Sequence, residues 1–303
     1  MITDAPSMDT RCVMIEFFQA VADHGFLQYA VMAGILSSIA CGIAGAYVVV
    51  RRISYIAGGI SHCVLAGMGA ARYCETVYGW TWFSPLYGAT AAALIAALII
   101  GFVSLRAKQR EDTVIGALWA IGMAVGVLFI ARTPGYNEDL MAYLFGNILM
   151  VSGNDLLLIL ALDVLVVVAG TIWHDQFQAV CFDEEYARLR GVPVDFFYLF
   201  LLGLIALTVV LLVTVVGVVL VIAMLTLPAA IAGHFARTLR GMMILATLLC
   251  VFFTVSGLAL SYTPNLPAGA TIIVVAGTAY LVTAGFCMPA IRARLAVRFR
   301  GKR

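Results

Sequence analysis

Nine long apolar runs dominate this sequence, and they restrict the chain to folds whose helices cross a membrane. The runs lie at 26–50, 53–71, 84–105, 114–131, 156–173, 194–212, 215–232, 242–260 and 269–291. A helix of about 20 apolar residues crosses the hydrocarbon core of a bilayer. Only 11% of the 303 residues are charged, whereas soluble domains carry about 25%. The sequence therefore predicts an all-α, polytopic membrane bundle with eight or nine transmembrane helices, eight if one run re-enters the bilayer.

Lysine and arginine collect on one side of these predicted spans. With the C-terminus placed in the cytoplasm, all of the 18 basic residues except Arg11, Arg72 and Arg132 fall on the inner side. The positive-inside rule favours this orientation over its inverse. The sequence thus predicts an extracytoplasmic N-terminal segment at 1–25, a transmembrane domain at 26–291 and a basic cytoplasmic tail at 292–303, which can anchor at anionic lipid.

A short charged island, at about 183–191, separates two of the apolar runs on the predicted cytoplasmic side. Asp183 can cap a helix, and Glu184 and Arg188 have the i,i+4 spacing of an ion pair. Gly191 can take the left-handed conformation that ends a helix, and Pro193 prevents its continuation. We expect a helix of two turns outside the bilayer that presents charge to a partner. The residues assigned to this surface are Asp183, Glu184, Glu185, Arg188, Arg190 and Gly191.

His62 is an ionisable residue inside the run 53–71. The residues at four-residue spacing on its face and on the adjacent stripe are all small: Gly58, Ala66 and Ala70, then Gly59, Cys63, Gly67 and Ala71. Small residues let helices approach closely, which predicts that the imidazole faces the protein interior. Imidazole is a common ligand for divalent transition metals. It can equally form a hydrogen bond across a helix interface, and this segment alone leaves both interpretations open.

Asp163 lies near the middle of the run 156–173. A carboxylate at that depth costs about 2.5–3.5 kcal/mol on insertion scales, so it must be protonated, paired or in contact with water. It can serve as a cation ligand on a metal path or accept a structural hydrogen bond. The absence of a basic partner nearby in the sequence favours the structural role.

The predicted outer side is acidic, and its acidic residues can raise the local concentration of cations. Glu138 and Asp139 are assigned to this outer mouth. Asp139 and Asp155 also suit the capping of helix N-termini, and this is the favoured interpretation for these two residues. The stretch 140–150 is too short to span a bilayer and predicts a broken or interfacial helix.

The motifs of common catalytic and nucleotide sites are absent from the sequence. It contains no phosphate-binding P-loop, no Gly-x-Ser-x-Gly elbow and no His-Glu-x-x-His pair. The seven cysteines include no Cys-x-x-Cys pair, although Cys12 and Cys74 fall on the same predicted outer side and could form a disulfide. The chain is therefore expected not to be an enzyme and to hold no permanently bound cofactor.

An ordered set of short motifs nevertheless resembles a known family. The motifs are Arg51 to Ile56 running into Ser61 to Gly67, Glu111 to Gly116, Leu140 to Leu149, Phe182 to Gly191, Val216 to Val221, Thr226 to Ala230 and Leu266 to Gly269. In this order, over about residues 27–290, the chain resembles the membrane permeases of bacterial ATP-binding-cassette importers for zinc, manganese and iron.

The resemblance implies a homodimer in the bacterial cytoplasmic membrane, with a divalent metal ion as the transported substrate. It implies that the island at 183–191 is a coupling helix for a separate cytoplasmic ATPase, and that an extracytoplasmic binding protein delivers the metal. Membrane lipid is the remaining expected partner, and nucleic acid is not expected. In many relatives an aspartate precedes the histidine by four residues and lines the cation path with it, but Gly58 occupies that position here.

Two other functions compete with an importer permease. A stand-alone secondary metal transporter driven by protons would use His62 and Asp163 as its relay. A membrane-embedded enzyme acting on lipid or peptide would need a set of catalytic polar groups at one depth, and the sequence shows none.

Overall fold

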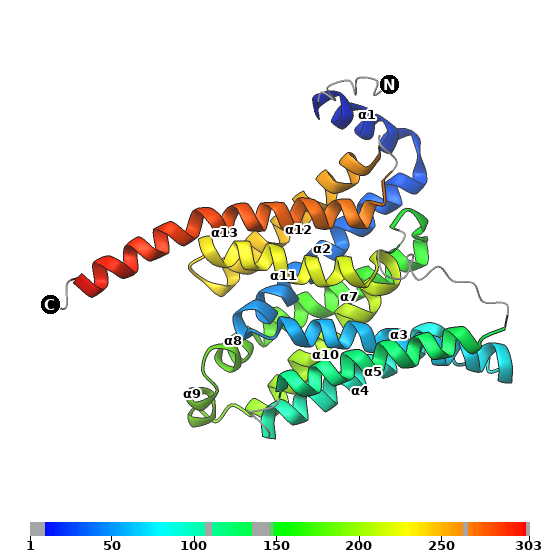
Figure 1. Ribbon diagram of the computed structural model, residues 1–303, viewed down its shortest axis with the longest axis horizontal. Helices are drawn as coiled ribbons and strands as arrows, with labels where there is room; N and C mark the ends of the chain where they lie inside the picture. Colours follow the sequence, from blue (N-terminus) through cyan, green and yellow to red (C-terminus); the bar gives the residue numbers. More distant parts are fainter. Residues whose placement is uncertain (1–9, 107–110, 135–145, 147, 263–265, 301–303) are drawn as a thin grey trace, which may run out of the picture.

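The structure is a computed structural model that describes residues 10–106, 111–134, 146, 148–262 and 266–300 (Figure 1). Within these residues every regular element is a helix, which confirms the predicted all-α fold. The helices are α1 (Thr10–Asp23), α2 (Gly25–Arg51), α3 (Ser54–Tyr78), α4 (Pro85–Arg106), α5 (Glu111–Arg132), the 3₁₀ turn η1 (Ile148–Met150), α7 (Gly153–Ile172), α8 (His174–Phe182), α9 (Glu184–Leu189), α10 (Val194–Val216), α11 (Val218–Phe235), α12 (Leu239–Tyr262) and α13 (Ala268–Arg300).

Eight helices among the described residues are long and apolar enough to cross a membrane: α2, α4, α5, α7, α10, α11, α12 and α13. The ninth predicted span, 53–71, forms the 25-residue helix α3, which is not among those eight. Its glycines, Ser61 and His62 lower its hydropathy. The predicted count of eight or nine transmembrane helices thus agrees with the structure. The count is nine if α3 is included and eight if it is not.

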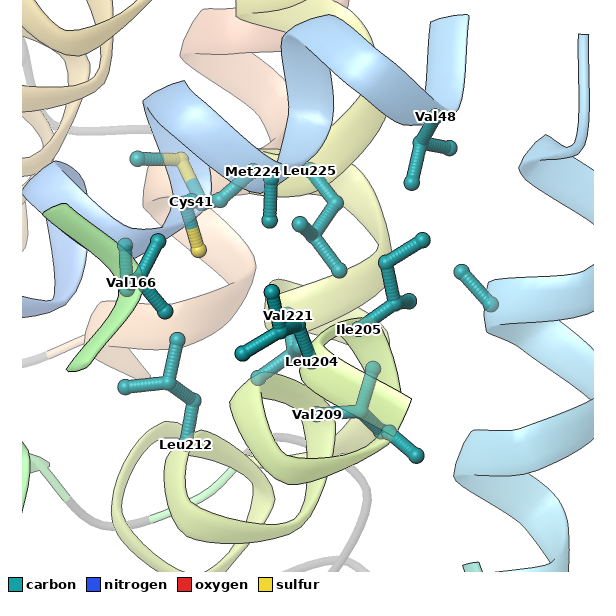
Figure 2. Packing of buried hydrophobic residues seen from close by; sticks show 14 of the residues in the cluster. Cys41, Val48, Val166, Leu204, Ile205, Val209, Leu212, Val221, Met224 and Leu225 are labelled. Atoms are coloured by element: carbon teal, nitrogen blue, oxygen red, sulfur yellow. The ribbon is translucent and has the colours of Figure 1, made fainter. Parts of the chain in front are cut away.

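Helix α2 lies near the centre of the bundle, where it packs against α7, α11 and α12. Figure 1 shows α3, α4 and α5 on one side of this centre and α11, α12 and α13 on the other. Side chains from α2, α7, α10 and α11 meet in the core between these groups, among them Cys41, Val166, Ile205 and Val221 (Figure 2). A Cβ atom on Gly45 of α2 would lie 2.3 Å from the carbonyl oxygen of Leu225, so only glycine permits this close approach of α2 and α11.

The segment between α5 and α7 is described only in part. Ile148–Met150 forms a 3₁₀ turn, and the rest of the predicted broken helix at 140–150 lies almost wholly outside the described residues. Asp155 and Ser152 form a reciprocal capping box at the start of α7, which confirms the capping role expected for Asp155. Glu138 and Asp139 lie outside the described residues, so their place at an outer mouth stays a prediction.

Candidate metal path and coupling surface

His62 is buried inside the bundle, with 8% of its surface exposed. Helix α3, which carries it, packs closely on α4 and α5 through small residues. A Cβ on Gly67 would lie 2.1 Å from the carbonyl oxygen of Gly88 on α4, and a Cβ on Gly122 of α5 would lie 2.9 Å from the Cα of Cys63. The small stripe therefore brings the helices together around the imidazole, as the spacing predicted.

The imidazole of His62 stacks on the indole ring of Trp119 from α5, with ring centroids 4.5 Å apart and planes 16° from parallel. The same indole covers Gly58, whose Cβ would lie 3.3 Å from it. Trp119 thus occupies space beside Gly58, the position at which the family resemblance implies an aspartate. Sequence reasoning missed Trp119, because nothing in a single apolar run indicates which helix it will face.

The Nδ1 atom of His62 has no hydrogen-bond partner among the described residues. A buried polar atom without a partner lowers stability, so such a group often has a role that a folding argument does not supply. No group of three or more His, Cys, Asp and Glu side chains that could hold a metal ion occurs in the described part of the chain. His62 in one copy therefore offers a single ligand rather than a complete metal cage.

Asp163 lies where α7 contacts α2, in a different helix contact from that of His62. Its side chain is buried, and Oδ1 accepts a hydrogen bond from the backbone N–H of Ala40 on α2 at 3.1 Å, whereas Oδ2 has no partner among the described residues. Helix α7, which carries Asp163, packs on α2, α8 and α10, whereas α3 packs mainly on α4 and α5, with smaller contacts to α10, α11 and α2. The structure therefore places Asp163 and His62 in separate helix contacts, and it gives Asp163 a structural hydrogen bond.

The charged island folds as the short helix α9, and its local signals behave as expected. Asp183 Oδ1 accepts a hydrogen bond from the N–H of Tyr186 at 3.0 Å, which confirms the predicted N-cap. Gly191 has a φ of +78°, and the N–H of Val192 donates to the carbonyl oxygen of Ala187 at 3.0 Å. The helix ends at Leu189, just before this left-handed glycine, as the sequence predicted.

The predicted ion pair between Glu184 and Arg188 is wrong. Glu184 pairs with Arg51 at the C-terminal end of α2, and Arg188 pairs with Asp195 at the start of α10. The side chains of Arg51 and Glu184 are only 19% and 21% exposed. A partly buried partner from another helix offers a stronger interaction than an exposed i,i+4 neighbour, which contributes about 0.3–0.5 kcal/mol.

Arg51 joins the island to three other helices. Its Nη1 donates to the carbonyl oxygen of Val180 on α8 at 3.1 Å, and its Nη2 binds Glu184. Its guanidinium lies 5.1 Å from the ring centroid of Tyr198 on α10, and the hydroxyl of Tyr198 donates to Ser104 Oγ on α4 at 2.9 Å. Sequence reasoning used Arg51 to assign topology and as part of a family motif, but it missed this role because the partners of Arg51 are remote in sequence.

The exposed side of α9 carries both apolar and charged side chains. Ala187 is buried against the bundle, whereas Leu189 is 88% exposed and Tyr186 is 49% exposed beneath the guanidinium of Arg190. Glu185 and Arg188 are exposed on the same helix. An exposed leucine and tyrosine on a short, well-capped helix form a small surface suited to contact with another protein.

Comparisons with known proteins show which proteins the chain is similar to. Residues 23–287 match the model of a family described as the ABC 3 transport family. The chain is 43% identical over 282 residues to an uncharacterized membrane protein of Synechocystis, covering 93% of this chain and 98% of that protein. It is 33% identical to the manganese transport system membrane protein MntC of Halalkalibacterium halodurans, over 95% of both chains.

A solved structure is also similar. A chain of PsaBC from Streptococcus pneumoniae in complex with Fab superimposes with a TM-score of 0.78 at 30% identity, over 89% of this chain and 95% of that chain. The region that matches the family model, residues 23–287, includes His62, Asp163 and the whole of α9.

Proposed function

The chain belongs to the ABC 3 transport family and is the permease subunit of an ATP-binding-cassette importer for a divalent metal ion, and we propose that it works as a homodimer in the bacterial cytoplasmic membrane. ATP is hydrolysed on a separate subunit, in keeping with the absence of a P-loop from this sequence. The observation that carries the function is the family match over 23–287, which includes nearly all of the bundle.

In the proposed assembly the ATPase binds at the cytoplasmic end, against the coupling surface formed by Asp183, Glu184, Glu185, Arg188, Arg190 and Gly191. An extracytoplasmic protein delivers the metal at the other end. The basic residues Arg51, Arg188 and Arg240 lie at the same end of the described bundle as α9, which supports its cytoplasmic placement under the positive-inside rule.

His62 is proposed as a transient ligand on the metal path. The supporting observations are its burial, its unpartnered Nδ1 and the ring of Trp119, which fixes the orientation of the imidazole. One imidazole binds weakly, and the second copy of the chain can supply another His62 across the dimer axis. Weak binding suits a conduit, because a cation that is held tightly does not leave.

Variants of His62 test this role. His62→Ala is expected to abolish most metal uptake while the protein still assembles with its ATPase, and His62→Gln is expected to be nearly as damaging because an amide is a poor ligand for transition metals. His234→Ala is the matched control, since His234 is exposed at the end of α11. Normal uptake by the glutamine variant would instead assign His62 a hydrogen-bonding role.

Manganese is the first cargo to test, because relatives at 31–33% identity carry that metal in their names. Zinc and iron should compete with manganese for transport. Imidazole suits zinc and iron whereas carboxylate suits manganese, and Gly58 provides no carboxylate beside His62. Uptake of radioactive manganese, measured with an excess of unlabelled zinc or iron, ranks the three ions.

The coupling surface has its own test. Leu189→Asp places a charge in the exposed apolar patch without disturbing the core, so the variant is expected to fold normally, to lose co-purification with the ATPase and to lose uptake. Gln178→Ala on α8 is the control, because this side chain is also exposed at the same end. Unchanged co-purification of the Leu189 variant would contradict the proposed contact.

A further inference from the structure

A cavity of about 540 Å³ lies between α2, α7, α8 and α12, and neither His62 nor any residue of the coupling surface lines it. Its volume falls within the range of about 300–1,000 Å³ that is typical of small-molecule sites. Its walls are chiefly apolar and include Ile43, Val167, Ile244 and Leu248. The side chains of Ile244 and Leu248 are 63% and 60% exposed, and they belong to a helix that can cross the membrane. The cavity is therefore open on a side where α12 exposes apolar side chains, as a surface in contact with hydrocarbon would.

Polar groups gather at one end of this cavity, where His174 begins α8 and Arg240 lies in the first turn of α12. His174 is only 6% exposed. In the described part of the chain, neither its imidazole nor the guanidinium of Arg240 makes a hydrogen bond or an ion pair with a protein side chain. His174 is buried and has no side-chain partner among the described residues, although buried polar groups ordinarily have one. Arg240 is an exposed cation that lines the same cavity, where its guanidinium can bind an anionic group.

The charge state of His174 also suits an anion. Burial, together with the neighbouring charge of Arg240, holds the pKa of His174 below its usual range, and the opposing effect of Asp175 is smaller. The lowered pKa favours the neutral imidazole, whose N–H can donate to an oxygen of an anionic group. Arg240 then supplies the positive charge, and its planar guanidinium matches the geometry of a phosphate group.

The cavity is long enough to hold the headgroup, the glycerol and the first part of the acyl chains of a phospholipid. At about 1.5 Å per residue along a helix, the distance from Arg240 to Leu248 on α12 is about 12 Å, and that from His174 back to Val167 on α7 is about 10 Å. The polar end lies where the spans end, and the apolar wall continues into them. A headgroup phosphate at the polar end would thus place its glycerol and the first part of its acyl chains against the apolar wall.

We propose that this cavity binds a membrane phospholipid with an anionic headgroup, whose phosphate contacts Arg240 and His174 and whose acyl chains lie along α7 and α12. Acyl chains gain little by leaving the bilayer for an apolar wall, because both are hydrocarbon. Selectivity must therefore come from the polar end, where a basic pocket between transmembrane helices favours anionic over zwitterionic headgroups.

The test measures lipid retention by native mass spectrometry on the full chain, purified in detergent and stripped of lipid. Dioleoyl phosphatidylglycerol and dioleoyl phosphatidylcholine are added in equal amounts, so that the acyl chains match and only the headgroup differs. The wild type is expected to retain the anionic lipid about fivefold to tenfold better. Equal retention of the two lipids would show an unselective annular contact and overturn the proposal.

Three variants locate the site. Arg240→Gln is expected to reduce the preference, whereas Arg237→Gln keeps it in full. Arg237 is exposed at the same end but does not line the cavity. Ile244→Trp fills the apolar part and is expected to reduce retention of both lipids, and its exposed position allows it to fold even if the Arg240 variant does not. Equal losses in the two arginine variants would indicate a general charge effect and contradict the proposal.

Excess inorganic phosphate distinguishes a lipid from a free anion as the occupant. The lipid proposal predicts that inorganic phosphate does not displace the bound phosphatidylglycerol, because the acyl chains add contacts that the free anion lacks. Displacement by phosphate, with retention unchanged in Ile244→Trp, would assign the polar end to a free anion and overturn the lipid assignment.

Discussion

Replacing Arg51 with glutamine should release α9 from the bundle while leaving the bundle itself folded. Arg51 makes a charge-assisted hydrogen bond to the Val180 carbonyl, an ion pair with Glu184 and a cation–π contact with Tyr198. Hydrogen bonds to charged groups contribute about 1.5–3 kcal/mol and a cation–π contact about 0.5–1 kcal/mol. Because the ion pair is one-fifth exposed, we take the lower part of these ranges, about 2 kcal/mol.

A loss of about 2 kcal/mol corresponds to about a 30-fold increase in the population of the detached helix. The effect is local, because α9 is six residues long and packs on the bundle mainly through Ala187. Hydrogen–deuterium exchange of the amides at 183–192 should therefore accelerate about 30-fold, whereas exchange in α2 and α10 stays unchanged. In the reconstituted transporter, the number of metal ions imported per ATP hydrolysed should fall.

Arg188→Gln is the matched control for this experiment. Its ion pair with Asp195 joins side chains that are each more than half exposed, so its loss should cost at most about 1 kcal/mol. The double variant Arg51→Gln, Glu184→Gln should exchange little faster than Arg51→Gln alone, because Glu184→Gln removes only the ion pair that the Arg51 variant already lacks. Equal exchange rates for the Arg51 and Arg188 variants would refute the assignment of Arg51 as the residue that holds α9.

Three further predictions concern packing, Asp163 and topology. Gly67→Val places a Cβ atom 2.1 Å from a carbonyl oxygen of α4. The variant should be less stable by about 1–3 kcal/mol, which a lower melting temperature would show. Gly116→Val is the control, because a Cβ atom on Gly116 meets no atom within 4 Å. Asp163→Asn keeps an acceptor for the amide on α2 and should retain both stability and uptake; a loss of uptake alone would place Asp163 on the metal path. A cysteine in place of Thr81 should react with an impermeant thiol reagent from outside, and one in place of Arg237 only after permeabilisation. The reverse pattern would contradict the predicted orientation.

Signals that act over a few residues were predictable from the sequence. The cap at Asp183, the stop at Gly191 and the capping box at Asp155 depend only on local backbone chemistry, and each is present in the structure. The burial of His62 was also predictable, because small residues at four-residue spacing define a packing face whichever helix comes to lie against it.

Contacts between helices that are distant in sequence were not predictable. The spacing of Glu184 and Arg188 fits an ion pair, but the tertiary fold brings Arg51 to Glu184 in a less exposed position. The stacking of Trp119 on His62 depends on the packing of α5 against α3. Hydropathy fixes which segments are helices in the membrane but not which helices are neighbours.

ATP-driven uptake in proteoliposomes tests the central claim most directly. The permease and its ATPase are reconstituted with ATP in the lumen, and radioactive manganese, zinc or iron is supplied outside with the binding protein. The account predicts accumulation that requires both ATP and the ATPase and that persists when the proton gradient is collapsed. Uptake by the permease alone that follows the proton gradient would contradict the account and support a proton-coupled secondary transporter.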